Sequence, residues 1–172
     1  MGGIIAQTFV SRFPKVVNKL VLVSTASNHT FMSSTQKQWP SDLEGKIEAL
    51  KRYFSPNFAE KNMLLVKAMA KMMQKSSEQA SESTDAQSFD QGSQLQKLAL
   101  KGFNLDQQIK SIGLPTLIIH GLEDQIIPAQ AAKHIQKLIP NSKLNEIEKI
   151  GHLLLAECPK YFYQEAFNFL NE

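Results

Sequence analysis

The amino-acid sequence predicts an α/β fold in which about three parallel strands are flanked by helices. Two short apolar runs, KLVLV at 19–23 and TLIIH at 116–120, are typical of strands buried on both faces of a sheet. A weaker, more charged run at 144–150 predicts a third strand at a sheet edge. Helical patterns alternate with these runs along the chain, and this alternation favours parallel strands.

The helix predicted at the N-terminus rests on apolar spacing and on one proline. Ile5, Phe9 and Phe13 recur every four residues, which predicts a helix over 4–13. Pro14 disfavours helical geometry at Phe13, so the helix is expected to end there.

Two more helices are expected in the last third of the chain. Apolar residues recur at helical spacing over 131–139, and Pro140 closes that segment. Pro159 is placed to open the last helix, because proline suits the first position of a helix. Phe162 and Phe169 then lie on one apolar stripe.

The middle third of the chain is predicted to be helical, apart from one polar stretch. Apolar residues recur at helical spacing over 42–54, over 61–74 and again over 95–103. Residues 74–94 hold six serines and five glutamines, which favours either a mobile loop or a poorly packed helix. This region is therefore expected to be a helical insertion between the first two strands.

Length, composition and charge exclude several classes of protein. With 172 residues, 42% of them apolar, the chain is long enough for one compact domain. Its net charge is +3 and no basic run exceeds two residues, which argues against a nucleic-acid binder. The apolar runs are too short for a membrane span. Cys158 is the only cysteine, which excludes a disulfide framework and favours a cytoplasmic location.

One acidic residue stands where parallel sheets place functional groups. The predicted strand at 116–120 is followed by Gly121, which suits a tight turn, and then by Asp124. Ligands bind beyond the carboxyl ends of the strands in open parallel sheets. Two interpretations stay open for Asp124 alone: a functional acid, or an exposed or helix-capping residue ahead of Pro128.

A histidine follows the third predicted strand in the same manner. His152 comes directly after Gly151 and lies 28 residues beyond Asp124. A single histidine after a strand is more often structural, but side chains that follow neighbouring parallel strands can meet above the sheet. An aspartate bonded to one imidazole nitrogen leaves the other nitrogen to accept a proton from a nucleophile. The pair therefore predicts an acid and a general base.

The other histidines and the cysteine are weaker candidates. His29 is expected in a polar loop, His134 on a helix surface and His120 in a structural position at a strand end. They lack the close spacing of metal ligands, so no metal site is predicted. Cys158 precedes Pro159, where a helix start can lower a thiol pKa, but a small apolar residue is the favoured interpretation.

Three segments together resemble the α/β-hydrolase fold family: LVLVST at 20–25, PTLIIHGLEDQIIP at 115–128 and Gly151-His152. The resemblance is closest to small esterases, lactonases and carbon–carbon hydrolases with a helical cap. The family order of Ser, Asp and His along the chain implies that Asp124 and His152 are the last two members of a catalytic triad.

The resemblance also implies how the chain is divided. Residues 1–30 and 104–172 are expected to form a partial α/β-hydrolase core, and residues 31–103 a helical cap. A small apolar acyl or ester-type substrate is implied, without a metal or organic cofactor.

The family's nucleophile is expected outside this sequence. Family members carry the serine in a Gly-x-Ser-x-Gly turn, often within GHSMGG. The first three residues, MGG, match the end of that motif, so the expected serine directly precedes Met1. Met1 then corresponds to the residue whose backbone N–H belongs to the oxyanion hole. The chain is expected to be the C-terminal part of a serine-type hydrolase and to be inactive alone.

Two serines of the chain were weighed as substitutes for that nucleophile. Ser11 lies two or three turns into the first helix, too far from the expected elbow. Ser24 follows the first strand and is expected near the site, but without the sharp turn that exposes a nucleophile.

Four residues are expected to contact the substrate. Ile126 and Leu153 adjoin the catalytic pair, and Trp39 and Met63 belong to the cap. Plain core packing is the favoured interpretation of the cap residues, because methionine and aromatic side chains usually fill cores.

Two non-catalytic interpretations stay open. An unpaired apolar strand edge is a template for association, so the chain could be an interaction domain. Its first strand would then pair with a second copy or with a separately encoded N-terminal half. The other interpretation is a truncated remnant without function.

Overall fold

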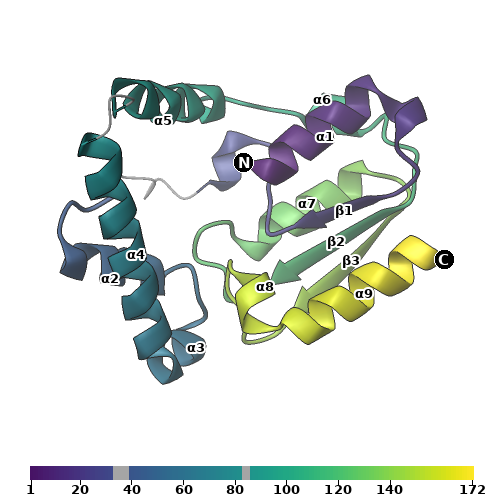
Figure 1. The fold of residues 1–172 in the computed structure, drawn as a ribbon. Helices are drawn as coiled ribbons and strands as arrows, with labels where there is room; N and C mark the ends of the chain where they lie inside the picture. The colour runs from purple at the N-terminus through teal and green to yellow at the C-terminus, as the bar shows by residue number, and fades with distance from the viewer. Residues whose placement is uncertain (33–38, 83–85) are drawn as a thin grey trace.

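A three-stranded parallel sheet forms the centre of the molecule, as the sequence predicted (Figure 1). The computed structural model describes residues 1–32, 39–82 and 86–172. The strands stand in the order β1-β2-β3, with the bounds Leu20–Val23, Thr116–Gly121 and Ser142–Ile147. Thr116 of β2 pairs with Leu20 on one side and with Ser142 on the other. The carboxyl ends of the strands therefore lie at one end of the sheet.

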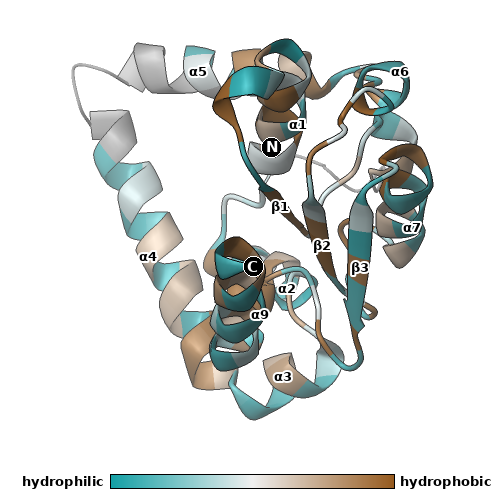
Figure 2. Cartoon of the chain, turned by 90° about the vertical axis from the view of Figure 1, so that its right-hand side faces the viewer, coloured by the Kyte–Doolittle hydropathy of each residue, from teal (hydrophilic) through white to brown (hydrophobic). Residues whose placement is uncertain are grey.

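Helices cover both faces of the sheet. One face carries α1 (Gly2–Arg12), α6 (Asp106–Ile109) and α7 (Ala129–Leu138), and the other carries α8 (Leu154–Glu157) and α9 (Pro159–Asn171). The side chains of β2 alternate between the two faces. Ile118 joins the apolar cluster with α1 and α7, whereas Leu117 and Ile119 join the cluster with α8 and α9. Burial on both faces explains the apolar run Leu117–Ile119 in the middle of this strand, where β2 is brown (Figure 2).

The helical region between β1 and β2 stands beside the sheet (Figure 1). It contains α2 (Leu43–Lys51), α3 (Pro56–Lys61), α4 (Met63–Glu82) and α5 (Ala86–Leu100). We call this region the cap. Phe54, Val66 and Ala70 centre an apolar cluster of its own. The two crossings between cap and sheet run side by side, because Asn28 and Asn104 form an antiparallel bridge. That bridge adjoins the expected boundaries at 30 and 104, and the division into domains stays a prediction.

The third strand differs from its prediction over 144–150. It begins at Ser142 and ends at Ile147, where its pairing with Gly121 of β2 ends. Lys149 then adopts a φ of 59°, in the left-handed region, so the chain leaves the sheet at this point. The prediction was too long because apolar Ile150 belongs to the loop that follows.

The helix predicted over 61–74 corresponds to α4, which begins at Met63, two residues later than predicted. α3 ends at Lys61 and α4 begins at Met63. Asn62 separates the two helices, since its side-chain amide donates to the Phe58 carbonyl oxygen at 2.9 Å and its backbone leaves the helical region. A side chain that hydrogen-bonds the backbone locally competes with helix continuation.

The polar stretch over 74–94 is helical in its described part. α4 continues to Glu82 and α5 begins at Ala86. Of the two structures predicted for this stretch, a mobile loop and a helix, the described residues form a helix. Residues 83–85 lie outside the described part of the chain.

Apolar surface is uncovered near the outer edge of β1. Within the described residues, β1 pairs with β2 alone. Ile5 and Phe9 on α1 are 60% and 47% exposed, Phe13 directly after α1 is 54% exposed, and Val16 in the short 3-10 helix Pro14–Val16 is 70% exposed. The apolar spacing that predicted α1 therefore marks a face that this chain does not bury.

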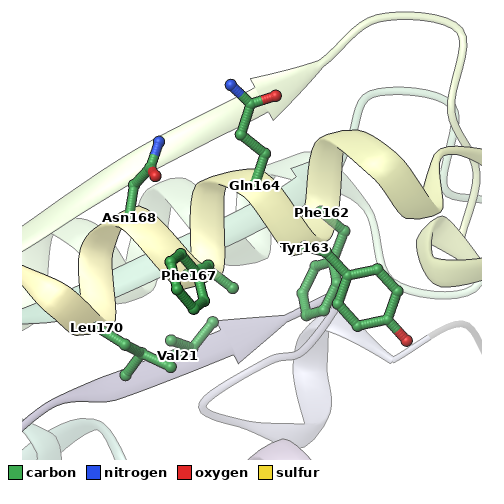
Figure 3. A pocket seen from close by; sticks show the side chains of 8 residues that line it. Val21, Phe162, Tyr163, Gln164, Phe167, Asn168 and Leu170 are labelled. Atoms are coloured by element: carbon green, nitrogen blue, oxygen red, sulfur yellow. The ribbon is translucent and has the colours of Figure 1, made fainter.

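A cavity of about 600 Å³ lies between β1 and α9 on the same side of the molecule. Figure 3 shows Val21 of β1 facing Phe162, Phe167 and Leu170 of α9 across it. None of the predicted catalytic residues lines this cavity. It belongs to the uncovered apolar surface and is separate from the candidate site.

Gly121 is required at the end of β2, because a Cβ there would lie 2.3 Å from the Ile150 carbonyl oxygen. We expect Gly121→Ala to lower the free energy of unfolding by about 1–3 kcal/mol, since the loop after β3 must move. Gly113→Ala is the matched control, because its added Cβ meets no atom within 4 Å. That change is expected to be neutral or to stabilise by up to about 1 kcal/mol. Urea unfolding measures both, and equal stabilities would contradict the requirement.

Candidate active site

Asp124 lies in the turn that follows β2, with its side chain fully buried. One carboxylate oxygen, Oδ1, accepts hydrogen bonds from the backbone N–H groups of Ile126 at 2.8 Å and Ile127 at 2.9 Å. An aspartate that bonds the backbone two and three residues ahead forms a local turn without help from other segments. The turn leaves the second oxygen, Oδ2, available to another part of the chain.

His152 supplies the partner of that second oxygen. Its Nδ1 lies 2.7 Å from Asp124 Oδ2, and its side chain is 22% exposed. Because a carboxylate only accepts, Nδ1 carries the proton of this hydrogen bond. Nε2 of the same ring is then free to accept a proton. The structure therefore brings together the two residues that the sequence singled out, in the arrangement of an acid and a base.

His120 lies beside the pair and has a structural place, as predicted. Its ring is fully buried at the end of β2, with Nε2 2.9 Å from the Ile127 carbonyl oxygen and 3.6 Å from Asp124 Oδ2. Burial lowers the pKa of His120 below its usual value, despite the nearby Asp124 charge. The ring is neutral at neutral pH and donates its Nε2–H to the carbonyl oxygen. It does not replace His152 as the charged partner of Asp124.

An aromatic pair from the cap lies against His152. The Tyr53 ring meets the His152 ring edge to face, with centroids 5.6 Å apart, and Trp39 stacks on Tyr53 at the same separation. Burial raises the pKa of Tyr53, and the charge of Asp124 acts in the same direction. Trp39, an expected substrate contact, thus packs on Tyr53, which in turn contacts the His152 ring. The sequence analysis missed Tyr53, which stands between Arg52 and Phe54 with no motif to mark it.

The other three expected substrate contacts lie in apolar clusters. Ile126 packs in a small cluster against which Tyr53 also packs, so it adjoins the aromatic pair. Leu153 and Met63 pack instead on the cap's own cluster around Phe54. Their contact with a substrate stays a prediction.

Met63 also lines a second cavity, of about 490 Å³, between the cap and the turn that holds Asp124. Gln125 is its lining residue from that turn, and neither Asp124 nor His152 lines it. The cavity therefore lies next to the turn of Asp124 without opening on Asp124 or His152.

Met1 stands at the start of α1, where its carbonyl oxygen accepts from the backbone N–H of Ile4 at 2.9 Å. The helix start is held close to the carboxyl end of β1. A Cβ on Gly3 would lie 2.4 Å from the Thr25 hydroxyl oxygen, and the Gln7 side chain donates to the Ala26 carbonyl oxygen at 3.1 Å. Figure 1 shows the N-terminus at the same end of the sheet as the strand ends. The oxyanion role expected for Met1 stays a prediction.

His134 has a partner that the sequence analysis did not foresee. Its Nε2 lies 2.8 Å from Oδ2 of Asp106, which also accepts from the Asn28 side chain at 2.9 Å, while Oδ1 accepts from Ser27 at 2.5 Å. Burial acts to raise the pKa of Asp106, but hydrogen bonds from Ser27, His134 and Asn28 lower it. This cluster joins the segment after β1 to α6 and α7 at the cap crossings, so the surface position expected for His134 is wrong in part.

The remaining candidates show no exposed nucleophile. Ser24 has a φ of 43°, so it does lie in a sharp turn, contrary to expectation, but its hydroxyl is buried without a partner. Ser11 donates to the Gln7 carbonyl oxygen within α1. Burial raises the pKa of Cys158, which favours the apolar interpretation. His29 lies in a short 3-10 helix, His29–Phe31, rather than a loop.

Comparisons with known proteins identify the family. The family model described as alpha/beta hydrolase fold matches residues 1–159. The chain is 25% identical over 171 residues to Lipase 1 of Psychrobacter immobilis, covering 92% of this chain and 49% of that protein. It is 26% identical over 171 residues to 2-hydroxy-6-oxo-2,4-heptadienoate hydrolase of Pseudomonas putida, covering 98% and 60%. A meta-cleavage product hydrolase from Pseudomonas fluorescens superposes with a TM-score of 0.75 at 21% identity, covering 98% and 61%.

This chain belongs to the α/β-hydrolase family, and the expected fold class is confirmed. The chain spans about half the length of the curated lipases it matches: 49% of Lipase 1 and 50% of Lipase 3 from Moraxella sp.. Within the described residues no helix is long and apolar enough to cross a bilayer. The same part of the chain holds no group of three metal-ligating side chains that could bind a metal ion.

His120 is expected to make the stability of the folded chain depend on pH. Because burial lowers the pKa of His120 below the usual histidine value of 6.5, the unfolded chain binds a proton at a higher pH than the folded chain. Its contribution is therefore complete above that value and is lost as the pH falls below it. His120→Gln keeps an N–H donor for Ile127 but does not titrate. Urea unfolding near neutral pH and at mildly acidic pH should show a smaller loss for the variant, and equal losses would contradict this assignment.

Proposed function

We propose that this chain carries the acid and the general base of a serine-type hydrolase, with the nucleophile outside residues 1–172. The observation that carries the proposal is the 2.7 Å contact between buried Asp124 and His152. The family supports a hydrolase, since its members here include lipases and a carbon–carbon hydrolase. The chain's match to about half of those lipases leaves room for a nucleophile from the other half.

The pair can run both halves of an acyl transfer. In the first half, His152 Nε2 takes the proton of the serine hydroxyl as the serine oxygen bonds to the substrate's carbonyl carbon. The buried Asp124 carboxylate stabilises the resulting imidazolium and keeps the ring oriented. His152 then gives that proton to the leaving group as the bond to it breaks. In the second half, His152 takes a proton from water as the water oxygen bonds to the acyl carbon, and it then returns that proton to the serine oxygen as the acyl–serine bond breaks.

Developing charge on the substrate oxygen needs hydrogen-bond donors in this scheme. In the proposed arrangement the backbone N–H of Met1 is one of them, supplied when another residue is joined before it. The start of α1 beside Thr25, at the carboxyl end of β1, supports this place for Met1.

The proposed substrate is a small apolar ester or related acyl compound. Trp39, Tyr53 and Ile126 present apolar and aromatic surface next to the pair, which suits an apolar group better than a charged one. Part of that surface comes from the cap, so the cap contributes to the choice of substrate.

The chain alone is expected to lack esterase activity, because an acid and a base without a nucleophile cannot form the acyl intermediate. The coding DNA directly upstream of Met1 is expected to continue the reading frame through Gly-x-Ser. Expression from that upstream frame should yield hydrolysis of a short p-nitrophenyl ester, and His152→Ala should lower kcat roughly 10⁴-fold or more. His29→Ala, in the cap crossing, is the control for loss of an imidazole.

Two results would overturn the proposal. One is turnover by residues 1–172 alone that His152→Ala abolishes, since the nucleophile would then lie within this chain. The other is an upstream frame closed by stop codons.

A second candidate function is an interaction domain that pairs through β1. The specific observation in its favour is the uncovered apolar surface, where Val21 and Phe167 face the 600 Å³ cavity and Phe167 is 68% exposed. Large exposed apolar patches mark interaction surfaces.

This second function requires purified chain to form a complex of defined stoichiometry. Light scattering after size exclusion is expected to show that complex, and Phe167→Glu to dissociate it, because a charge would enter the apolar surface. Leu64→Glu, at a residue 85% exposed on the cap, is the matched control and should leave the mass unchanged. A monodisperse, folded monomer would exclude this function.

A further inference from the structure

The carboxylate of Glu157 joins the loop that carries His152 to the cap. Glu157 is the last residue of α8, and its Oε1 accepts from the backbone N–H of Gly151 at 2.9 Å. The same oxygen accepts from the backbone N–H of Ser55 at 3.0 Å, and Oε2 accepts from the Ser55 hydroxyl at 2.5 Å. One side chain thus satisfies donors from two segments about a hundred residues apart in the sequence.

The two segments also touch directly. A Cβ on Gly151 would lie 2.5 Å from the backbone of Phe54 and Ser55, so only glycine permits this approach. On the other side of His152, the backbone N–H of Leu153 donates to the Tyr53 carbonyl oxygen at 2.9 Å. Both chain neighbours of His152 are therefore held by the cap corner formed by residues 53–55.

The hydrogen bonds to the Glu157 carboxylate are the strongest of the contacts between the His152 loop and the cap corner. Hydrogen bonds to an ionised acceptor are roughly twice as strong as neutral ones, and Glu157 accepts three. Ser55 is 1% exposed, so water cannot readily replace its bond to the carboxylate. Glu157 does not hydrogen-bond the His152 ring, so it acts on the ring through Gly151 and the cap corner.

We propose that Glu157 is a positioning residue that makes the Asp124–His152 geometry depend on the cap. With the carboxylate in place, the loop after β3 is fixed at Gly151, and the ring of His152 is held against Asp124 and Tyr53. Without it, the loop is free to move away from the cap corner, and the Asp124–His152 bond opens more often. The inference rests on the proposed role of His152 and adds a link between cap position and the general base.

The test measures the Asp124–His152 bond without turnover. The full chain is labelled with ¹⁵N-histidine, and the hydrogen-bonded Nδ1–H of His152 is observed by NMR. Its signal is assigned by its loss in His152→Ala. The rate at which this proton exchanges with water is then measured. Glu157→Gln is expected to speed that exchange at least about tenfold, because charge-assisted bonds that hold the loop are lost. Glu148→Gln, at an exposed position, is the control for the change of charge and should leave exchange unchanged.

Ser55 provides a second, milder pair of variants. Ser55→Ala removes the hydroxyl that bonds Glu157 and is expected to speed exchange in the same direction, whereas Ser55→Thr keeps a hydroxyl and should restore the slow rate. Thermal unfolding is recorded for each variant, so exchange is compared in chains that remain folded. If Glu157→Gln does not fold, the Ser55 pair decides.

The outcomes separate this inference from the proposed function. A wild-type chain that is folded but shows no hydrogen-bonded Nδ1–H would contradict the catalytic pair itself. A wild-type chain with the protected proton, and equal exchange in the Glu157 and Ser55 variants, would overturn the positioning role and leave the pair intact.

Discussion

The buried carboxylate of Asp124 is the constraint on which the site depends. A charged group without water is stable only where hydrogen bonds replace its hydration. Asp124 receives two of its bonds from Ile126 and Ile127, within its own turn, and a third from His152 in a loop that is distant in sequence. The need to satisfy one carboxylate therefore ties the loop after β2 to the loop after β3. This is why an acid and a base that are far apart in the chain form a contact.

That contact restricts the residues around it. The two loops approach so closely that Gly121 cannot carry a Cβ against Ile150. His120, on the same strand, lies within 3.6 Å of the carboxylate, and a protonated ring there would compete with His152 for its charge. Burial lowers the pKa of His120 and keeps the ring neutral, so the Asp124 charge acts on His152. Hydrophobic burial of β2 thus has an electrostatic consequence at the site.

The sheet and the contact between Asp124 and His152 were predictable because each depends on a local pattern or on simple topology. Apolar runs mark β1 and β2, and parallel strands bring the residues that follow them to one end. Tyr53, Asp106 and Glu157 were not predictable, since each acts through contacts with segments that carry no complementary motif. Helical spacing predicted the apolar stripe on α1. It could not predict whether Phe9 on that stripe is buried, because burial depends on which other surface packs against the helix.

The catalytic pair and the uncovered edge are physically separable in this fold. Asp124 and His152 follow β2 and β3, their supports come from α8 and the cap, and the three hydrogen bonds to the Asp124 carboxylate come from described residues. The uncovered apolar surface lies on α1, β1 and α9 instead. Covering that surface would add hydrophobic stabilisation without changing the donors of Asp124. The beginning of α1 links the two regions, because Gly3 packs on Thr25 where β1 ends. In the proposed enzyme, a serine joined to Met1 would therefore approach His152 from the side of β1, while residues 53–55 of the cap hold the loop that carries the base.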